Sequence, residues 1–137
     1  MKMASWILLT IVGLLIALFS FGSMGVAYMG AASSDVITGS TSLADLSLSE
    51  DVATALRGRR GTAAAFGFAF ATMFLIIVLG PYRKREVWAW WALLCPTVVL
   101  AGILALRIPT LGTSQGVSTG VTLLVAVGIG LLLDVRR

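Results

Sequence analysis

Few side chains in this sequence could carry out chemistry, and none of them form a recognisable catalytic group. Histidine, the commonest general acid or base and the commonest metal ligand, is absent from the 137 residues. Cys95 is the single cysteine, so no intrachain disulfide can form. There is also no glycine-rich phosphate loop, metal-ligand cluster or nucleophile paired with a base. The sequence therefore predicts no catalytic residue, no metal site and no cofactor, although it is compatible with a bound lipid or quinone.

The acidic residues lie in polar segments, outside the long apolar runs. A membrane enzyme of lipid or quinone metabolism could use Asp35, Glu50, Asp51, Arg57 or Glu86, but solvated charge is the simpler explanation of these residues. Charges inside a membrane are costly and usually mark ion paths, proton relays or active sites. Since the apolar runs hold none, we expect neither a proton-coupled transporter nor an intramembrane acid/base enzyme.

Composition indicates which solvent these elements face. Hydrophobic residues make up 58% of the chain and charged residues 12%, with a mean hydropathy of +1.01. A soluble domain carries roughly 25% charged residues, so this chain has too few to cover a water-facing surface, and the sequence predicts a membrane protein. The net charge of +4 comes from short basic clusters between apolar runs, a pattern that does not favour nucleic-acid binding.

Four apolar runs predict four transmembrane helices in a single domain over 1–137. A membrane-crossing helix needs about 20 residues, and the expected spans are about 4–29, 61–80, 87–106 and 113–133. Lys2 before the first run also fits a signal peptide, but the apolar core of a signal peptide has only about 7–15 residues. We expect Pro81 to close the second span and Pro96 to kink the third.

The segment 31–60 is the one substantial polar loop. Within it, Ser47 and Glu50 have the spacing of a capping box, Val52 and Leu56 follow at helical spacing, and Gly58 is placed to end the helix. The predicted fold class is therefore all-α: a transmembrane four-helix bundle with a short amphipathic helix in the first loop, on the membrane surface or capping the bundle.

Basic residues near the spans predict the orientation, because they favour the cytoplasmic side. One side would hold Lys2, Arg83, Lys84, Arg85, Arg136 and Arg137, and the other Arg57, Arg59, Arg60 and Arg107. The larger group places both termini in the cytoplasm and the loop 31–60 outside it. The pair Arg59 and Arg60 argues against this orientation.

The turn after the second span combines bases with aromatic rings. Its members are Arg83, Lys84, Arg85, Trp88, Trp90 and Trp91. Tryptophan prefers the headgroup level of a membrane because its ring is apolar and its N–H needs a partner. The sequence thus predicts a lipid-interface anchor. The alternative is a recognition site for an anionic lipid headgroup or a quinone.

Small residues recur at a spacing of four in three of the expected spans. They are Gly13, Ala17, Ala63, Gly67, Ala71, Gly116 and Gly120. Small residues let membrane helices approach closely. We expect them to pack the helices of this chain against one another, and the alternative is that one such face receives a partner subunit.

Phe66, Phe70 and Phe74 form an aromatic stripe on the second span. They are the candidate lining of a pocket for a pigment, a quinone or a sterol-like ligand. A lipid-facing or core position is the more ordinary interpretation of such a stripe.

The small-residue helix 61–79, the basic turn and the tryptophan-rich segment 83–91 together resemble small bacterial DoxX-like four-helix membrane proteins. The resemblance covers about a third of the chain. It implies a small helical bundle, in a group of which some members associate with respiratory or redox complexes. It implies no catalytic residue here, because histidines and intramembrane acids are missing.

Together these features predict a non-enzymatic, multi-pass membrane protein. It would be an accessory or assembly subunit of a membrane complex, or a binder of a hydrophobic small molecule such as a lipid, quinone or pigment. Its expected partners are membrane lipids and either other membrane subunits or further copies of itself, with no nucleic acid. The alternatives are a small oligomeric channel or facilitator, which would need more polar lining groups, and the membrane enzyme described above.

Overall fold

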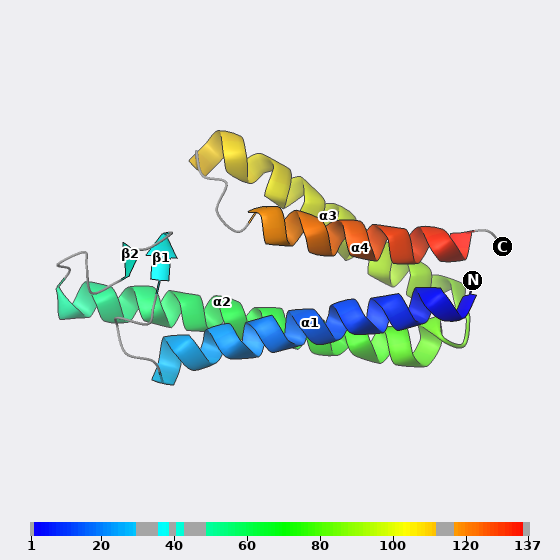
Figure 1. The fold of residues 1–137 in the computed structure, drawn as a ribbon, viewed down its shortest axis with the longest axis horizontal. Helices are drawn as coiled ribbons and strands as arrows, with labels where there is room; N and C mark the ends of the chain where they lie inside the picture. The colour runs from blue at the N-terminus through cyan, green and yellow to red at the C-terminus, as the bar shows by residue number, and fades with distance from the viewer. Residues whose placement is uncertain (1, 30–35, 39–40, 43–48, 112–116, 136–137) are drawn as a thin grey trace. The chain divides into compact units, whose positions relative to one another are not determined.

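A computed structural model describes residues 2–29, 36–38, 41–42, 49–111 and 117–135 of the chain. Its four α-helices are α1 (Lys2–Met29), α2 (Glu50–Ile77), α3 (Val87–Leu111) and α4 (Val117–Val135) (Figure 1). A π-helical turn, η3 (Val78–Tyr82), continues α2, and the segment between α1 and α2 holds a small antiparallel hairpin of β1 (Val36–Thr38) and β2 (Thr41–Ser42). The predicted helical class with four main helices is confirmed.

Three stretches are long and apolar enough to cross a membrane. They are Ala4–Met29, Glu50–Tyr82 and Val87–Leu106, with mean hydropathies of 2.4, 2.3 and 2.1. Only 17%, 22% and 11% of their most apolar windows are buried, so most of this apolar surface is exposed. Exposed apolar surface on this scale is rare in soluble monomers and typical of a protein whose solvent is lipid. The apolar stretch described in α4, Thr119–Asp134, is shorter.

Contacts between the described residues group the chain into two compact units. The first comprises residues 1–14 and 73–137, and the second comprises residues 15–72. The expectation of a single domain over 1–137 stays a prediction.

The first unit has an apolar core. Its fully buried side chains include Leu9 of α1, Val78 of η3, Leu93 of α3 and Leu131 of α4. The helices α3 and α4 are antiparallel, because Trp90 near the start of α3 contacts Leu131 near the end of α4, whereas Leu104 lies against Gly120. The core thus joins residues from both ends of the sequence.

In the second unit, the second half of α1 pairs with residues 50–72 of α2. Ser20 lies against Gly67, and Tyr28 lies against Gly61, so the two segments are antiparallel. Phe21 and Phe68 add a ring contact, with centroids 6.0 Å apart. Small residues face larger ones across this pair, which allows the close approach that stabilises helix association in lipid.

The start of α2 differs from the prediction. No separate amphipathic helix is found in the described residues, because α2 begins at Glu50 and runs without a break through Gly58 to Ile77. The predicted second span, 61–80, is therefore the continuation of this helix. Glycine ends a helix when it adopts a left-handed conformation, whereas Gly58 has no positive φ. In a helix interior it is tolerated at about 1 kcal/mol relative to alanine.

The prediction that Pro81 closes the second helix is also wrong. Pro81 lies inside η3, where the wider π turn accommodates a residue that lacks an N–H group. The helical path ends instead around Arg85, which has a φ of 66°. Glu86 N donates to Pro81 O at 3.0 Å, and Arg85 N donates to Tyr82 O at 2.9 Å. These two bonds and the left-handed residue form a Schellman motif, with arginine where glycine is usual.

The remaining helix bounds differ by a few residues from those predicted. Helix α3 continues past 106 to Leu111 and includes Pro109 as well as Pro96. A proline keeps a helix-compatible φ, so it removes one hydrogen bond without forcing the helix to end. Helix α4 begins at Val117, and the predicted start at 113 lies outside the described residues. The kink at Pro96 stays a prediction.

Candidate functional site

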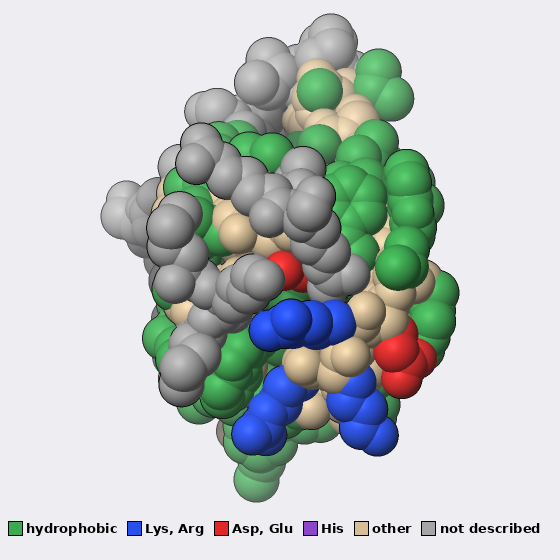
Figure 2. Space-filling view, turned by 90° about the vertical axis from the view of Figure 1, so that its right-hand side faces the viewer, with side chains coloured by type: hydrophobic (Ala, Val, Ile, Leu, Met, Phe, Trp, Pro, Cys, Tyr) green, Lys and Arg blue, Asp and Glu red, His purple; other side chains and the backbone are tan. Residues whose placement is uncertain are grey.

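The basic turn predicted to meet the membrane interface lies between η3 and α3, in the first unit. Arg83, Lys84 and Arg85 are all exposed, as are Glu86 and Trp88 that follow them. The Schellman motif positions this turn, because it reverses the chain within a few residues of the buried Tyr82. Figure 2 views this end of the first unit and shows Lys and Arg side chains next to hydrophobic ones. Cations and apolar groups side by side are what a membrane interface attracts.

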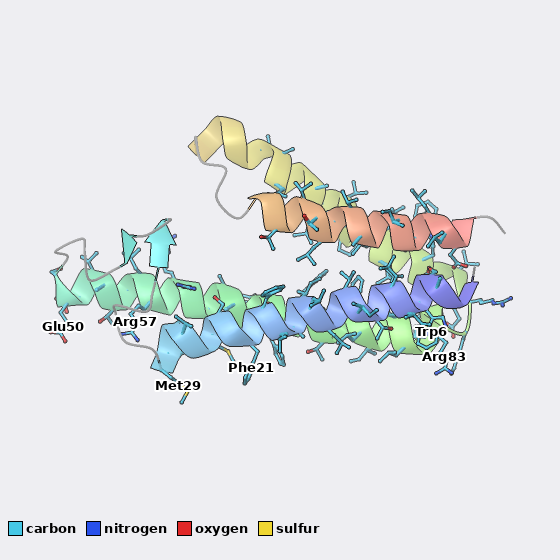
Figure 3. The ribbon with its side chains drawn as sticks, in the orientation of Figure 1. Trp6, Phe21, Met29, Glu50, Arg57 and Arg83 are labelled. Carbon is cyan, nitrogen blue, oxygen red and sulfur yellow. The ribbon has the colours of Figure 1, made fainter. Side chains whose placement is uncertain are left out.

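Trp6 of α1 adds a fourth aromatic ring to this turn. The guanidinium carbon of Arg83 lies 5.1 Å from the centroid of its indole ring, a cation–π contact (Figure 3). Contacts of this kind contribute about 0.5–1 kcal/mol at exposed sites. Trp6 was not predicted at this turn, although its signal was available: a tryptophan about one helical turn after the basic Lys2.

The three tryptophans of α3 divide into two groups. Trp88 and Trp91 are each 55% exposed, and the indole N–H of Trp88 donates to Glu86 Oε2. Trp90 is half-buried, and its indole N–H points to Leu131 O of α4 at 3.4 Å. Trp88 and Trp91 thus have the exposure that an interfacial anchor needs, whereas Trp90 packs the bundle. The lipid-interface role of the set stays a prediction.

A buried polar contact joins three elements of the first unit and was not predicted. Ser5 Oγ donates to Gly130 O at 2.6 Å and lies 2.7 Å from the hydroxyl of Tyr82. Because the one hydroxyl proton of Ser5 goes to the carbonyl, the Tyr82 hydroxyl donates to Ser5. Both side chains are buried. These bonds fix the register of α1, η3 and α4, and sequence alone could not indicate which hydroxyls would meet.

Most of the predicted packing residues lie at helix contacts. A Cβ added at Gly13 would lie 2.7 Å from Leu75 Cδ2, one at Gly67 would lie 2.7 Å from Ser20 Oγ, and one at Gly120 would lie 3.1 Å from Leu104 Cδ2. Ala71 is fully buried and Ala17 is half-buried.

Other residues do not follow the predicted packing pattern. Ala63 is exposed, so it does not pack against the described residues, and Gly116 lies outside them. Gly61 and Gly130, which the spacing of four missed, lie against Tyr28 and Leu9. The packed face follows the mixed three-and-four spacing of a helix rather than a strict four.

The three phenylalanines of the candidate aromatic stripe differ in how far they are exposed. Phe66 is 73% exposed, Phe70 is half-buried, and Phe74 is 4% exposed and lies against Gly13. The second unit has a hollow that none of these three phenylalanines lines. Its lining residues are Ala27, Tyr28, Thr54, Arg57 and Gly58. The ligand-binding role of the three phenylalanines stays a prediction, and their burial pattern fits a helix that passes from exposed surface into the core.

The acidic candidates for an enzyme are spread out. Glu50 and Asp51 are exposed in the first turn of α2, where negative charge is favourable for the helix dipole. Glu86 accepts the hydrogen bond from Trp88, and Asp35 lies outside the described residues. The described members of this set therefore have local structural partners or positions that account for them.

Comparison with protein-family models, with curated proteins and with solved structures finds no match for the chain. The likeness to DoxX-like proteins stays an expectation from sequence.

Proposed function

We propose that this chain is a non-enzymatic integral membrane protein. In this proposal it serves as an accessory or assembly subunit of a membrane complex, or holds a hydrophobic small molecule such as a lipid, quinone or pigment. The observation that carries the proposal is the exposure of large apolar side chains along the long helices, for example Leu18, Ile76 and Ile103, each at least 60% exposed. Apolar groups so placed need lipid or another apolar surface against them.

Glycines at which an added Cβ would meet none of the described residues favour a protein partner as well as lipid. A Cβ built at Gly22 or Gly25 of α1 meets no atom within 4 Å, and the same holds at Gly102 of α3. Such positions cost helix propensity, and they let a neighbouring helix approach closely. Ala63, exposed on α2, extends this property to a third helix.

The proposal includes four membrane crossings with both termini in the cytoplasm. Helix α4 has 19 residues, which at 1.5 Å per residue gives about 28 Å, close to the hydrocarbon thickness of about 30 Å. The DoxX-like resemblance supports the same bundle and contributes no catalytic residue to the proposal.

Purification from the native membrane tests this function. Carbonate extraction first establishes that the protein is integral to the membrane. Native mass spectrometry of the full chain in a mild detergent should then detect a co-purifying subunit, a further copy or a bound lipid-like molecule. A monomer that carries none of these in several mild detergents would contradict the proposal.

A further inference from the structure

The hollow of the second unit lies where the last turns of α1 approach the first turns of α2. Its lining residues are Ala27 and Tyr28 from α1 and Thr54, Arg57 and Gly58 from α2, and its volume is about 290 Å³. This lies close to the lower end of the range for small-molecule pockets, about 300 Å³. Figure 3 shows Arg57 on α2 near this end of the unit, and Met29 at the end of α1.

Hydrogen-bond donors suited to a phosphate surround this hollow. Arg57 is half-buried, and the hydroxyl-bearing residues Thr54 and Tyr28 share the lining with it. The planar guanidinium of arginine matches the oxygens of a phosphate group and binds them in pairs. Next to the hollow, the Nε of Arg60 donates to Ser23 Oγ at 3.3 Å. This contact directs a second cation towards α1.

The hollow also lies at the depth expected of a headgroup. Tyr28 and Met29 end the apolar stretch Ala4–Met29, whereas α2 begins with the acidic pair Glu50 and Asp51 before its apolar part. The lining residues therefore lie where apolar sequence gives way to polar sequence. In a membrane protein that transition coincides with the interface between hydrocarbon and water.

Exposed aromatic side chains lie on the same two helices, further into their apolar stretches. Phe21, two helical turns before Tyr28, is 58% exposed and contacts Phe68, which is 38% exposed, with ring centroids 6.0 Å apart. A free phosphate ion would use the cationic hollow and gain nothing from these rings. A phospholipid would use both, with its phosphate in the hollow and an acyl chain along the rings.

We propose that the second unit binds an anionic phospholipid, with the phosphate held by Arg57 and the hydroxyls of Thr54 and Tyr28, and with an acyl chain along Phe21 and Phe68. This inference rests on the proposed membrane location. It also accounts for Arg57 on the side of the membrane expected to carry fewer bases, because this arginine binds the phosphate.

The test uses the full chain, purified and delipidated in dodecyl maltoside and titrated with dioctanoyl phosphatidylglycerol. Arg57→Gln should weaken binding at least tenfold, because it removes a charge-assisted contact. Arg59→Gln is the matched control, since Arg59 is exposed two residues away and does not line the hollow. It should change binding less than twofold. Equal weakening by the two variants would show diffuse attraction only and would overturn the proposed site.

A second pair of variants tests the shape of the hollow without changing its charge. Gly58 lines the hollow, and a Cβ built there meets no atom within 4 Å, so Gly58→Leu should fold and occupy the space. We expect it to weaken dioctanoyl phosphatidylglycerol binding at least fivefold. Gly22→Leu, at an equally open glycine outside the hollow, should leave binding unchanged. Unchanged binding in a folded Gly58→Leu protein would overturn the proposal.

Two further ligands test whether the site prefers an anionic lipid to a zwitterionic lipid and to free phosphate. Dioctanoyl phosphatidylcholine should bind at least fivefold more weakly than the anionic lipid, and inorganic phosphate should compete only at concentrations far above that of the lipid. Competition by phosphate at equal concentration would overturn a lipid site. If the protein resists carbonate extraction and co-purifies with a subunit, but binds no anionic lipid, the proposed function stands and this inference fails.

Discussion

The hydroxyl of Ser5 joins α1 to η3 and α4 through its bonds with Tyr82 and Gly130. Ser5→Ala removes both hydrogen bonds from a buried site, so we expect the free energy of unfolding in detergent to fall by about 1–2 kcal/mol. Equilibrium unfolding of the purified chain would measure the loss. Thr72→Ala is the control, because the Thr72 hydroxyl is exposed and bonds within its own helix to Phe68 O. A similar loss in both variants would contradict a special role for Ser5.

Arg85 holds a left-handed backbone conformation that favours glycine. Arg85→Gly and Arg85→Val both remove the positive charge, so the difference between them reports the backbone. We expect the valine variant to be less stable than the glycine variant by about 1–2 kcal/mol, because a β-branched residue is strongly disfavoured at positive φ. Thermal unfolding of the two variants measures this difference. Equal stabilities would mean that the turn does not require this conformation.

At the scale of the helices, one substitution near the start of α2 tests whether this helix is continuous. The two possible arrangements predict stability changes of opposite sign. Gly58→Ala should raise stability by about 0.5–1 kcal/mol, because Gly58 lies inside a continuous helix and a Cβ there meets open space. If Gly58 instead ended a short amphipathic helix in a left-handed conformation, the same substitution would lower stability. The sign of the change in unfolding free energy therefore decides between the two arrangements.

The packing of α1 can be tested at glycines that differ in their surroundings. Gly13→Ala would place its Cβ within 3.0 Å of Leu75 and Phe74 side-chain atoms, so we expect a loss of about 1–3 kcal/mol. Gly22→Ala, where the added atom meets nothing, should be neutral or slightly stabilising. Unfolding measurements on both variants give the comparison. A neutral Gly13→Ala variant would show that this contact yields easily.

The sequence could predict the helices themselves because hydropathy and length dictate them in lipid, as for Ala4–Met29. The helix ends expected at Gly58 and at Pro81 are absent from the structure. Glycine and proline permit a break in a helix without requiring one, so sequence alone could not decide these two positions. It also could not separate Trp90 from Trp91 or Ala63 from Ala64. Which face of a helix is buried depends on the neighbouring helices, and α1, α3 and α4 are all apolar on every side.

At the scale of the whole molecule, the number of crossings decides where the chain ends lie. We expect reporter fusions at the N-terminus and at the C-terminus both to be cytoplasmic, because the proposed four crossings would return the chain to its starting side, with the larger group of bases there. Green fluorescent protein should fluoresce at either end, and alkaline phosphatase should be inactive at either end. Chain ends on opposite sides would leave three crossings, those of the three longest apolar stretches.

The bond between Ser5 and Gly130 has a consequence for biosynthesis. The two residues are 125 positions apart, so nearly the whole chain must leave the ribosome before the first helix meets its last hydrogen-bond acceptor. Until then, the nascent helix carries a hydroxyl whose native acceptor has not yet been made. The first unit can therefore complete its packing only after α4 has been synthesised, and nascent chains stalled before α4 should be preferred substrates of membrane proteases.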